Sequence, residues 1–179
     1  MQDESKKSEQ EKAEFDDETL DFAYEVFQLA RNGDATMLSS LLDKGLTPNL
    51  RNHKGDSLLM LASYHGHLDA VQVLLEHKAD PEIRNDNGQK PIAGAAYKGD
   101  LAMVQLLLEH GADVEGTTPG GKTALMMAAM FNRSEIVDLL LAHGANVDAS
   151  DVNGVTALAA ATAMGAQDTP ARLQAKRTA

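Results

Sequence analysis

Apolar residues recur at helical spacing in short segments, and polar turns that contain glycine separate these segments. In one segment Val104, Leu107 and Leu108 would share one face of a helix. The pattern predicts pairs of short helices, and residues 57–65 and 68–77 form one such pair. A single pair cannot bury its apolar stripe alone, because the stripe needs a second surface to pack against. We therefore expect neighbouring pairs to stack.

The segments return at a fixed interval of 33 residues. Three ladders share this interval: Gly33, Gly66, Gly99 and Gly165; Gly55, Gly88, Gly121 and Gly154; and the pairs Glu76-His77, Glu109-His110 and Ala142-His143. Asn132 stands at the missing place of the first ladder. Asn is the side chain that best tolerates the left-handed backbone for which glycine is otherwise used. We expect Asn132 to continue the turn, and Gly111 and Gly144 to end the second helices of their units.

An interval of 33 residues with two helical segments per unit resembles the ankyrin repeat, and the resemblance covers the chain from about residue 17 onwards. It implies an all-α ankyrin-repeat solenoid of helix-turn-helix units with short β-hairpin-like turns. Three full repeats would lie between two capping repeats, with the boundaries 17–51, 52–84, 85–117, 118–150 and 151–179. The first capping repeat is expected to hold helices at 17–31 and 35–44. The charged residues 1–16 are expected to form a disordered leader.

The chain departs from the family pattern in three places. No repeat keeps the histidine of the family's Thr-Pro-Leu-His phrase, and the matching segments begin at Ser57, Lys90, Thr123 and Thr156. Gly94 falls inside the first helix of the repeat 85–117, where glycine costs up to about 1 kcal/mol relative to alanine. This middle repeat is therefore expected to be softer than its neighbours. In the last repeat Pro170 interrupts the apolar pattern, so a short helix is expected there with Thr169 as its cap.

The composition narrows the range of functions. The 179 residues carry a formal net charge of -11, and a negative surface repels the phosphate backbone of nucleic acids. The chain has no cysteine, which removes disulfides, thiolate metal sites and cysteine nucleophiles. Residues 1–14 lack the apolar core of a secretory signal, and no stretch is long and apolar enough to cross a membrane. We therefore expect a soluble, cytoplasmic protein that binds neither nucleic acid nor membrane.

The segment from Gly116 to Thr123 matches the phosphate-binding pattern G-x-x-x-x-G-K-[ST] and precedes a helix. Such a loop works when a buried strand delivers it and a second strand supplies a metal-holding aspartate, and neither is visible in the sequence. Gly121 and Thr123 also belong to columns of the repeat. The match is therefore interpreted as a coincidence of Gly116 and Lys122 with the repeat pattern.

The histidines suggest metal sites that the repeat explains more simply. His65, His67 and Asp69 mimic a metal-binding H-x-H-x-D motif, but they lie in the linker between two helices of a unit. His77, His110 and His143 recur once per unit, and helices packed about 8 to 10 Å apart hold them too far apart for one zinc ion. No metal is assigned. These three imidazoles are expected near helix C-termini, where a positive charge is mildly favoured.

The resemblance also implies where a partner would bind. In ankyrin repeat proteins, partners meet the hairpin tips and the exposed side of the first helices, which together line a concave face. On that face the expected binding row consists of Tyr64, His65, Tyr97, Lys98, Met130, Phe131 and Met164. The hairpin tips are expected to contribute His53, Lys54, Asp56, Asp86, Asn87, Gln89, Lys122 and Asn153.

The row is the stronger of the two signals, because aromatic residues and methionine are enriched at binding sites. Each signal also has an interpretation without a binding role. Met130 and Phe131 would carry no binding function if they packed beneath a neighbouring hairpin. Variation of charge between hairpin tips also arises by drift on a solvated surface.

These patterns predict a non-enzymatic protein-protein interaction module, an adaptor, inhibitor or stabilising partner, that is monomeric on its own. It would bind another protein of unknown identity without a cofactor or metal. No Ser-His-Asp set and no pair of carboxylates can be assigned to a catalytic site. Two alternatives stay open, a nucleotide-binding protein that uses Gly116 to Thr123, and a structural solenoid within a larger assembly.

Overall fold

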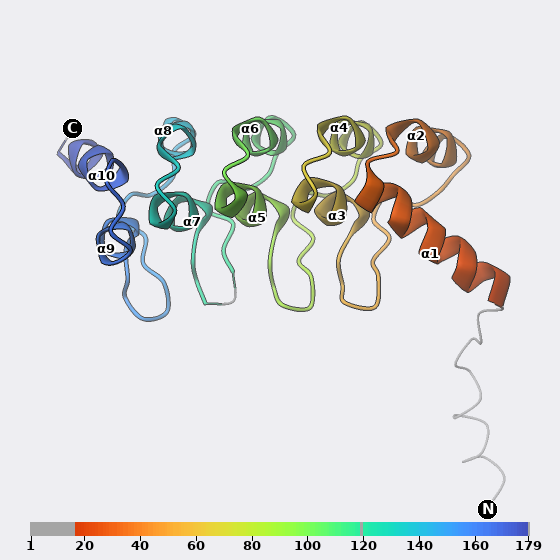
Figure 1. The fold of residues 1–179 in the computed structure, drawn as a ribbon, viewed down its shortest axis with the longest axis horizontal. Coiled ribbons are helices and arrows are strands. Elements are labelled where there is room, and N and C mark those ends of the chain that lie inside the picture. The colour runs from red at the N-terminus through yellow and green to blue at the C-terminus, as the bar shows by residue number, and fades with distance from the viewer. Residues whose placement is uncertain (1–16, 119, 179) are drawn as a thin grey trace, which may run out of the picture.

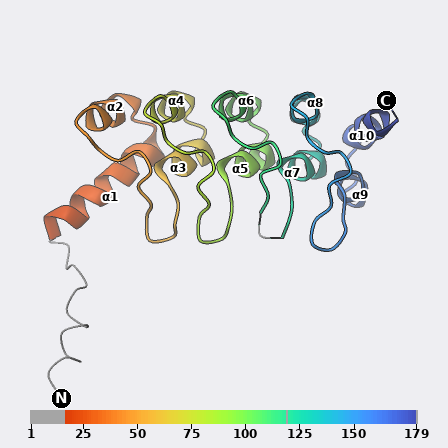
Figure 2. The same ribbon diagram turned by 180° about the vertical axis from the view of Figure 1, so that it is seen from behind.

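The computed structural model describes residues 17–118 and 120–178, which form ten α-helices in two layers (Figure 1). One layer holds the first helices of the units and the other their second helices. The hairpins project from the first-helix layer, away from the second helices (Figure 2). The helices are α1 Asp17–Asn32, α2 Ala35–Asp43, α3 Leu58–Tyr64, α4 Leu68–Glu76, α5 Pro91–Lys98, α6 Leu101–Glu109, α7 Ala124–Met130, α8 Ser134–Ala142, α9 Ala157–Ala163 and α10 Thr169–Arg177.

The all-α solenoid of helix-turn-helix units is confirmed. The expected helix boundaries in the first two units agree with the structure to within one residue. Isolated antiparallel bridges close three hairpins: Arg51 with Ser57, Thr117 with Thr123 and Ser150 with Thr156. The boundaries between units stay a prediction from the interval of 33, and the expected leader at 1–16 lies outside the described residues. Within the described ranges, no helix has both the length and the apolar character for crossing a bilayer.

Side chains cap most of the first helices. The hydroxyl oxygens of Ser57, Thr123 and Thr156 accept backbone N–H groups three residues further on, at 3.1, 3.2 and 3.3 Å. These bonds satisfy donors that the first turn of a helix leaves unpaired. Thr169 was expected to cap α10 in the same way, and that prediction is wrong. Asp168 precedes the helix instead, and the buried Thr169 hydroxyl donates to the carbonyl oxygen of Ala129 at 2.8 Å.

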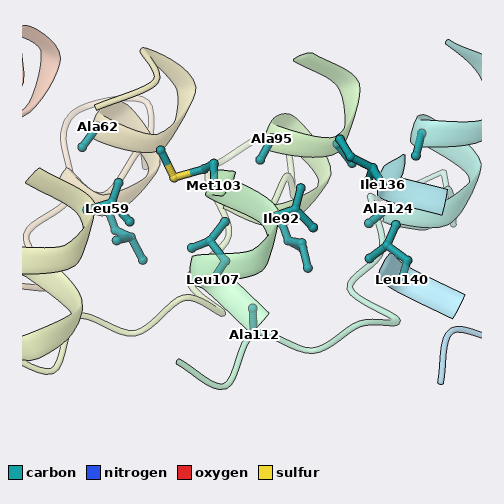
Figure 3. Packing of buried hydrophobic residues seen from close by; sticks show 14 of the residues in the cluster. Leu59, Ala62, Ile92, Ala95, Met103, Leu107, Ala112, Ala124, Ile136 and Leu140 are labelled. Atoms are coloured by element: carbon teal, nitrogen blue, oxygen red, sulfur yellow. The ribbon is translucent and has the colours of Figure 1, made fainter. Parts of the chain in front are cut away.

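The core is a column of leucines that runs through the second helices. Leu74, Leu107, Leu140 and Leu173 stand 33 residues apart and are fully buried. All four belong to one cluster of buried residues that runs through the units, and Figure 3 shows Leu107 and Leu140 within it. Burial of one such side chain stabilises the fold by about 1.5–3 kcal/mol. Leu173 thus lets α10 close the stack although Pro170 interrupts the pattern.

A ladder of hydrogen bonds links successive units at the start of each connecting segment. Side-chain oxygens of Asn49 and Glu82 accept the backbone N–H groups of Asp80 and Asp113, at 2.8 and 3.0 Å. Glu115 accepts the N–H of Asn146 in the same way. These bonds recur between residues 31 apart, so each unit supplies the acceptor for the next one. The stacking register is therefore fixed by polar groups as well as by the core.

The middle repeat lacks two local features that its neighbours have. Lys90 occupies the position of the capping hydroxyl, and α5 has no side-chain cap bond. Lys90 is only 6% exposed, and its ammonium group pairs with Glu82 and with Asp113, the latter at 3.8 Å. Gly94 stands in the interior of α5. Both features weaken the helix locally, in agreement with the soft repeat expected from the sequence.

The N-terminal end of the stack differs from its C-terminal end. Asp21 and Glu25 face solvent as expected from a capping helix, whereas Gln28 is half-buried. The same helix α1 also exposes Leu20, Phe22 and Tyr24, together with Met37 of α2. At the other end, α10 pairs Arg172 with Asp138 and Arg177 with Asp148. The apolar surface on α1 was not anticipated from the charged sequence around it.

Two non-glycine residues have a left-handed backbone, each at a position where other units have glycine. Asn132 has φ 55° and replaces glycine, as predicted. Its side chain has a second role, because the amide oxygen accepts the N–H groups of Asp168 and Thr169 at 2.9 and 3.2 Å. Lys78 has φ 68° at the position where Gly111 and Gly144 stand in the next units. A non-glycine residue in this region is strained, and no such hydrogen bond is seen to compensate Lys78 within the described residues.

We expect amide protons in the interior of α5 to exchange faster than those of α3 and α7. The physical reason is the missing side-chain cap at Lys90 and the glycine at position 94. Hydrogen exchange measured helix by helix under native conditions tests this. Equal protection of the three helices would contradict it.

Substitution of Lys78 by glycine should raise the free energy of unfolding by about 0.5–1 kcal/mol, because it removes the left-handed strain at a cost in chain entropy. Urea unfolding measures the change. Lys78→Ala keeps the strain and should bring no gain. Asn132→Gly should have the opposite effect and lower the free energy of unfolding by about 1 kcal/mol, since it removes the hydrogen bonds that hold the start of α10. Equal effects of the two glycine substitutions would contradict this assignment.

Candidate protein-binding surface

The predicted row lies at the last turn of the first helices, where the chain leaves one layer for the other. Tyr64, Tyr97 and Met164 are 51%, 42% and 54% exposed, whereas Met130 and Phe131 are half-buried. His65 and Lys98 are also exposed. We name the exposed surface of α3, α5, α7 and α9 the first-helix face. The row residues lie along this face in successive units (Figure 1).

Side-chain contacts connect the row from one unit to the next. The rings of Tyr97 and Phe131 meet edge to face with centroids 4.7 Å apart. The ammonium group of Lys98 lies 4.2 Å from the centre of the Tyr64 ring, a cation–π contact. Phe131 is therefore half-buried because it packs against Tyr97 of the preceding unit. Both tyrosines stay exposed, so the row presents aromatic surface in a fixed arrangement.

A hollow of about 300 Å³ lies on the first-helix face over α5, with α3 on one side and α7 on the other. Met60 and Tyr64 of α3 line one side, and Tyr97 of α5 and Met127 of α7 line the other. Gly94 contributes only backbone to this hollow, and a Cβ atom placed there would meet no atom within 4 Å. The hollow therefore exists where a side chain is missing from α5.

A group of cationic side chains lies beside this hollow, at the linkers between the two layers. It consists of Arg31, His65, His67 and Lys98. The imidazoles of His65 and His67 stack with centroids 6.2 Å apart, and His67 Nε2 bonds the carbonyl oxygen of Arg31 at 2.7 Å. Partial burial lowers the pKa of His65, and the nearby His67, Lys98 and Arg31 lower it further. Burial is thus the main reason that the neutral form of His65 is favoured, and the positive charge of this group comes from Arg31 and Lys98.

Hairpin tips are shaped by one polar residue per unit at the interval of 33. The side-chain oxygens of Asn52, Asn85 and Asp151 each accept the N–H groups two and four residues further along the hairpin, at 2.8–3.1 Å. Thr118 makes one such bond, to the N–H of Lys122. The N–H groups of Val155 and Asn153 lower the pKa of the buried Asp151 carboxyl. The hairpins are therefore rigid supports rather than free loops.

Several residues predicted at the hairpin tips are engaged within the stack. Asp86 pairs with Arg51 at 3.2 Å, and Lys122 lies 3.8 Å from Asp151. Asp56 and Gln89 both accept hydrogen bonds from the Asn85 amide, at 2.9 and 3.1 Å. Asp86, Lys122 and Asp56 thus link neighbouring hairpins, whereas Gln89 is held within its own hairpin. The remaining predicted tip residues lie exposed: His53, Lys54, Asn87 and Asn153.

The segment that matches a phosphate-binding loop forms the hairpin before α7; Pro119 within it lies outside the described residues. The N–H of Gly121 donates to the Thr118 carbonyl oxygen at 2.8 Å, and the Thr123 hydroxyl caps α7. A phosphate-binding loop instead turns its N–H groups towards the ligand and keeps its lysine and hydroxyl for phosphate and Mg²⁺. Here Lys122 faces Asp151, so the groups serve the hairpin.

The three periodic histidines act locally, as the sequence indicated. In His77, His110 and His143, the Nδ1–H group donates to the carbonyl oxygen four residues earlier, at 2.8, 2.9 and 2.9 Å. Each imidazole thus satisfies one carbonyl at the end of a second helix. In the described part of the chain, no three His, Asp or Glu residues gather closely enough to hold a metal ion.

Sequence reasoning missed the hollow and most of the cationic group. Gly94 was noticed only for its cost to helix stability, and Met60, Met127, Arg31 and His67 were not singled out. A signal was present in the repeat itself, because Leu61, Met127 and Ala160 carry side chains where Gly94 has none. The cationic group joins residues of three units, so it becomes visible only when the units are stacked.

Comparison with known proteins agrees with the repeat architecture. The sequence profile of the family described as ankyrin repeats (3 copies) matches residues 26–118 and residues 94–174. A protein of Pseudomonas aeruginosa, named as an ankyrin repeat protein, is 62% identical over 60 residues. The aligned segment makes up 34% of this chain and 35% of that protein. The match therefore spans about a third of that relative's length.

One electrostatic contact on the second helices makes stability depend on pH. Hydrogen bonds from His77 to the Val73 carbonyl oxygen and to Asp43 raise the pKa of His77 above its ordinary value of 6.5. The charged form is favoured in the folded state, so its contribution is complete below pH 6.5. It is lost as the pH rises through the folded-state pKa.

We expect His77→Gln to destabilise the protein more at about pH 5.5 than at about pH 8.5, because the protonated imidazole gains more from folding than the neutral one. Urea unfolding of both proteins across this pH range measures the difference. Asp43→Asn is the matched variant, since it removes the carboxylate partner and should flatten the pH dependence. A stability difference that does not change with pH would contradict the assignment.

Proposed function

This chain belongs to the ankyrin repeat family, and from that premise we propose that it binds another protein through its first-helix face and hairpin tips. Ankyrin repeats generally mediate protein–protein interaction. The proposal further assigns the chain a non-enzymatic role, as an adaptor, an inhibitor or a stabilising partner. It acts as a monomer in the cytoplasm, and it needs no cofactor, metal, nucleic acid or membrane for binding.

The exposed aromatic and methionine row carries this proposal. About half of the surface of Tyr64, Tyr97 and Met164 is exposed to solvent, whereas the leucines of the core column are fully buried. Tyrosine supplies a large contact area at a low cost in side-chain entropy, and it is over-represented among residues that dominate binding energy. A row of such residues on one face is therefore a surface suited to a protein partner.

The stack supports this surface in a fixed geometry. Tyr97 is held edge to face by Phe131, and Lys98 covers the ring of Tyr64. The hairpin tips stand on hydrogen-bonded turns that neighbouring units link together. A partner would therefore meet side chains that lose little freedom on binding, which favours affinity.

The two alternatives have less support. A nucleotide site would require Lys122 and Thr123 to leave their present partners in the hairpin and in α7. A purely structural solenoid would be expected to associate through its ends or faces, and measurement of the molar mass in solution tests that directly.

The triple variant Tyr64→Ala, Tyr97→Ala, Phe131→Ala should lose a protein partner that the wild-type chain retains. The reason is removal of the aromatic contact area from the first-helix face. Affinity capture from extract of cells that express the protein, with quantitative identification of bound proteins, makes the comparison.

A control triple variant on the opposite layer keeps the number of substitutions equal: Gln72→Ala, Gln105→Ala and Asp138→Ala, all at exposed positions. Circular dichroism and urea unfolding establish that both variants fold. A partner that stays bound to the row variant and leaves the control variant would place binding on the second helices and refute the proposal. ATP binding by the purified chain would favour the nucleotide alternative.

A further inference from the structure

Gly94 is the one residue in its column of first helices that carries no side chain. The same position holds Leu61 in α3, Met127 in α7 and Ala160 in α9. Leu61 and Ala160 are buried and Met127 is half-buried, so in these units a side chain fills the space between successive first helices. At Gly94 that space is open and forms the hollow over α5.

The fold itself does not require glycine at this position. The backbone of Gly94 does not have a positive φ, so other residues can adopt its conformation. A Cβ atom there would meet no neighbour within 4 Å, so alanine would fit without a clash. Glycine in a helix interior is unfavourable relative to alanine. Neither helix stability nor packing therefore explains glycine at position 94. A binding role for the hollow that glycine creates would explain it.

The walls of the hollow suit an apolar side chain. Met60 and Met127 offer flexible, polarisable surfaces that adapt to the shape of a partner group. Tyr64 and Tyr97 stand at the rim with exposed rings. About 300 Å³ stands at the lower end of pockets that hold whole small molecules. One large side chain of a protein partner matches this hollow in size and chemistry.

The charge beside the hollow points to an acidic partner. Tyr64 lines the hollow and also carries Lys98 on its ring, so the apolar and the cationic surfaces meet at this residue. Lys98, His65 and His67 gather there with Arg31 in a chain whose net charge is -11. Asp100 lies on the same surface, but one of its oxygens accepts the N–H of Met103 at 3.0 Å as the cap of α6. Arg31 and Lys98 therefore place two positive charges on this surface of an otherwise acidic protein, beside the carboxylate of Asp100.

We propose that the hollow at Gly94 receives one large apolar side chain from an acidic segment of the partner protein, and that carboxylates of this segment lie against Arg31 and Lys98. This inference rests on the proposed function, because it names the chemistry of the partner at the first-helix face.

The test begins with a library of random twelve-residue peptides displayed on phage and selected on the full chain. Enriched peptides are synthesised with a fluorescent label, and their dissociation constants are measured by fluorescence anisotropy. The enriched sequences should combine acidic residues with one large apolar residue, and replacement of that residue by alanine should weaken binding at least about tenfold. Enrichment of basic peptides, or of none, would overturn the proposal.

Substitutions at Gly94 then separate binding from folding. Gly94→Ala should raise the melting temperature by about 2–4 °C, because alanine favours the helix, and Gly94→Met should weaken peptide binding at least about tenfold by filling the hollow. The melting temperature of Gly94→Met is measured as well, and if it is not below that of the wild-type chain, the weaker binding cannot come from unfolding. Ala102→Met adds the same side chain on the opposite layer and should leave binding unchanged.

Two further variants test the charge. Arg31→Gln and Lys98→Gln should each weaken binding of the acidic peptide several-fold and reduce its dependence on salt. Unchanged affinity in both variants would show that acidic residues of the partner segment are not recognised here, and it would overturn that part of the proposal. A change in molar mass of Gly94→Met in solution would instead assign the hollow to a second copy of the chain and overturn the inference.

Failure of this inference can be told apart from failure of the proposed function. If the partner captured by the wild-type chain is lost with the row variant but kept by Gly94→Met, the face binds protein and the hollow does not take part. If the row variant also keeps the partner, the proposed function itself is wrong.

Discussion

Every other feature of this protein depends on stacking, because no unit can bury its apolar stripe alone. Leu74, Leu107, Leu140 and Leu173 reach full burial only because neighbouring units pack against one another. The side-chain acceptors Asn49, Glu82 and Glu115 fix the same register with hydrogen bonds to the following unit. Once both sets of contacts are satisfied, the first helices can present the same positions to solvent in every unit. The exposed row proposed to bind a partner is a consequence of that repetition.

The periodic part of the structure was predictable from the sequence because each column repeats one physical requirement. Asn132 could be placed in a left-handed turn from its column alone, and the histidines at the ends of second helices followed in the same way. The cap of α10 was mispredicted because Thr169 makes a contact with α7 that lies 40 residues away in the chain. The hollow could not be predicted, since an empty space depends on which neighbouring side chains fail to fill it.

Hairpin tips show why variation between repeats is an unreliable guide to binding residues. Asp86 and Lys122 differ in charge between units, as recognition residues would, yet both pair with residues of a hairpin in the stack. Their charges vary between units because each side chain pairs with a different residue of a neighbouring hairpin. The row at the ends of the first helices is different, because Tyr64 and Tyr97 remain exposed although they contact Lys98 and Phe131. Exposure that persists after all internal contacts are counted is the better criterion.

The two unusual residues of the middle repeat, Lys90 and Gly94, are connected, because both line the same hollow. Lys90 replaces the capping hydroxyl, lines the hollow with its stem and pairs with Glu82 beneath it. A Cβ atom on Gly116 would come within 3.0 Å of the Asp113 carbonyl oxygen and within 3.1 Å of the Lys90 stem, so both contacts favour glycine there. Gly116 is also the residue that completes the apparent phosphate-binding motif. Packing within the repeat therefore accounts for glycine at this position without a role in phosphate binding.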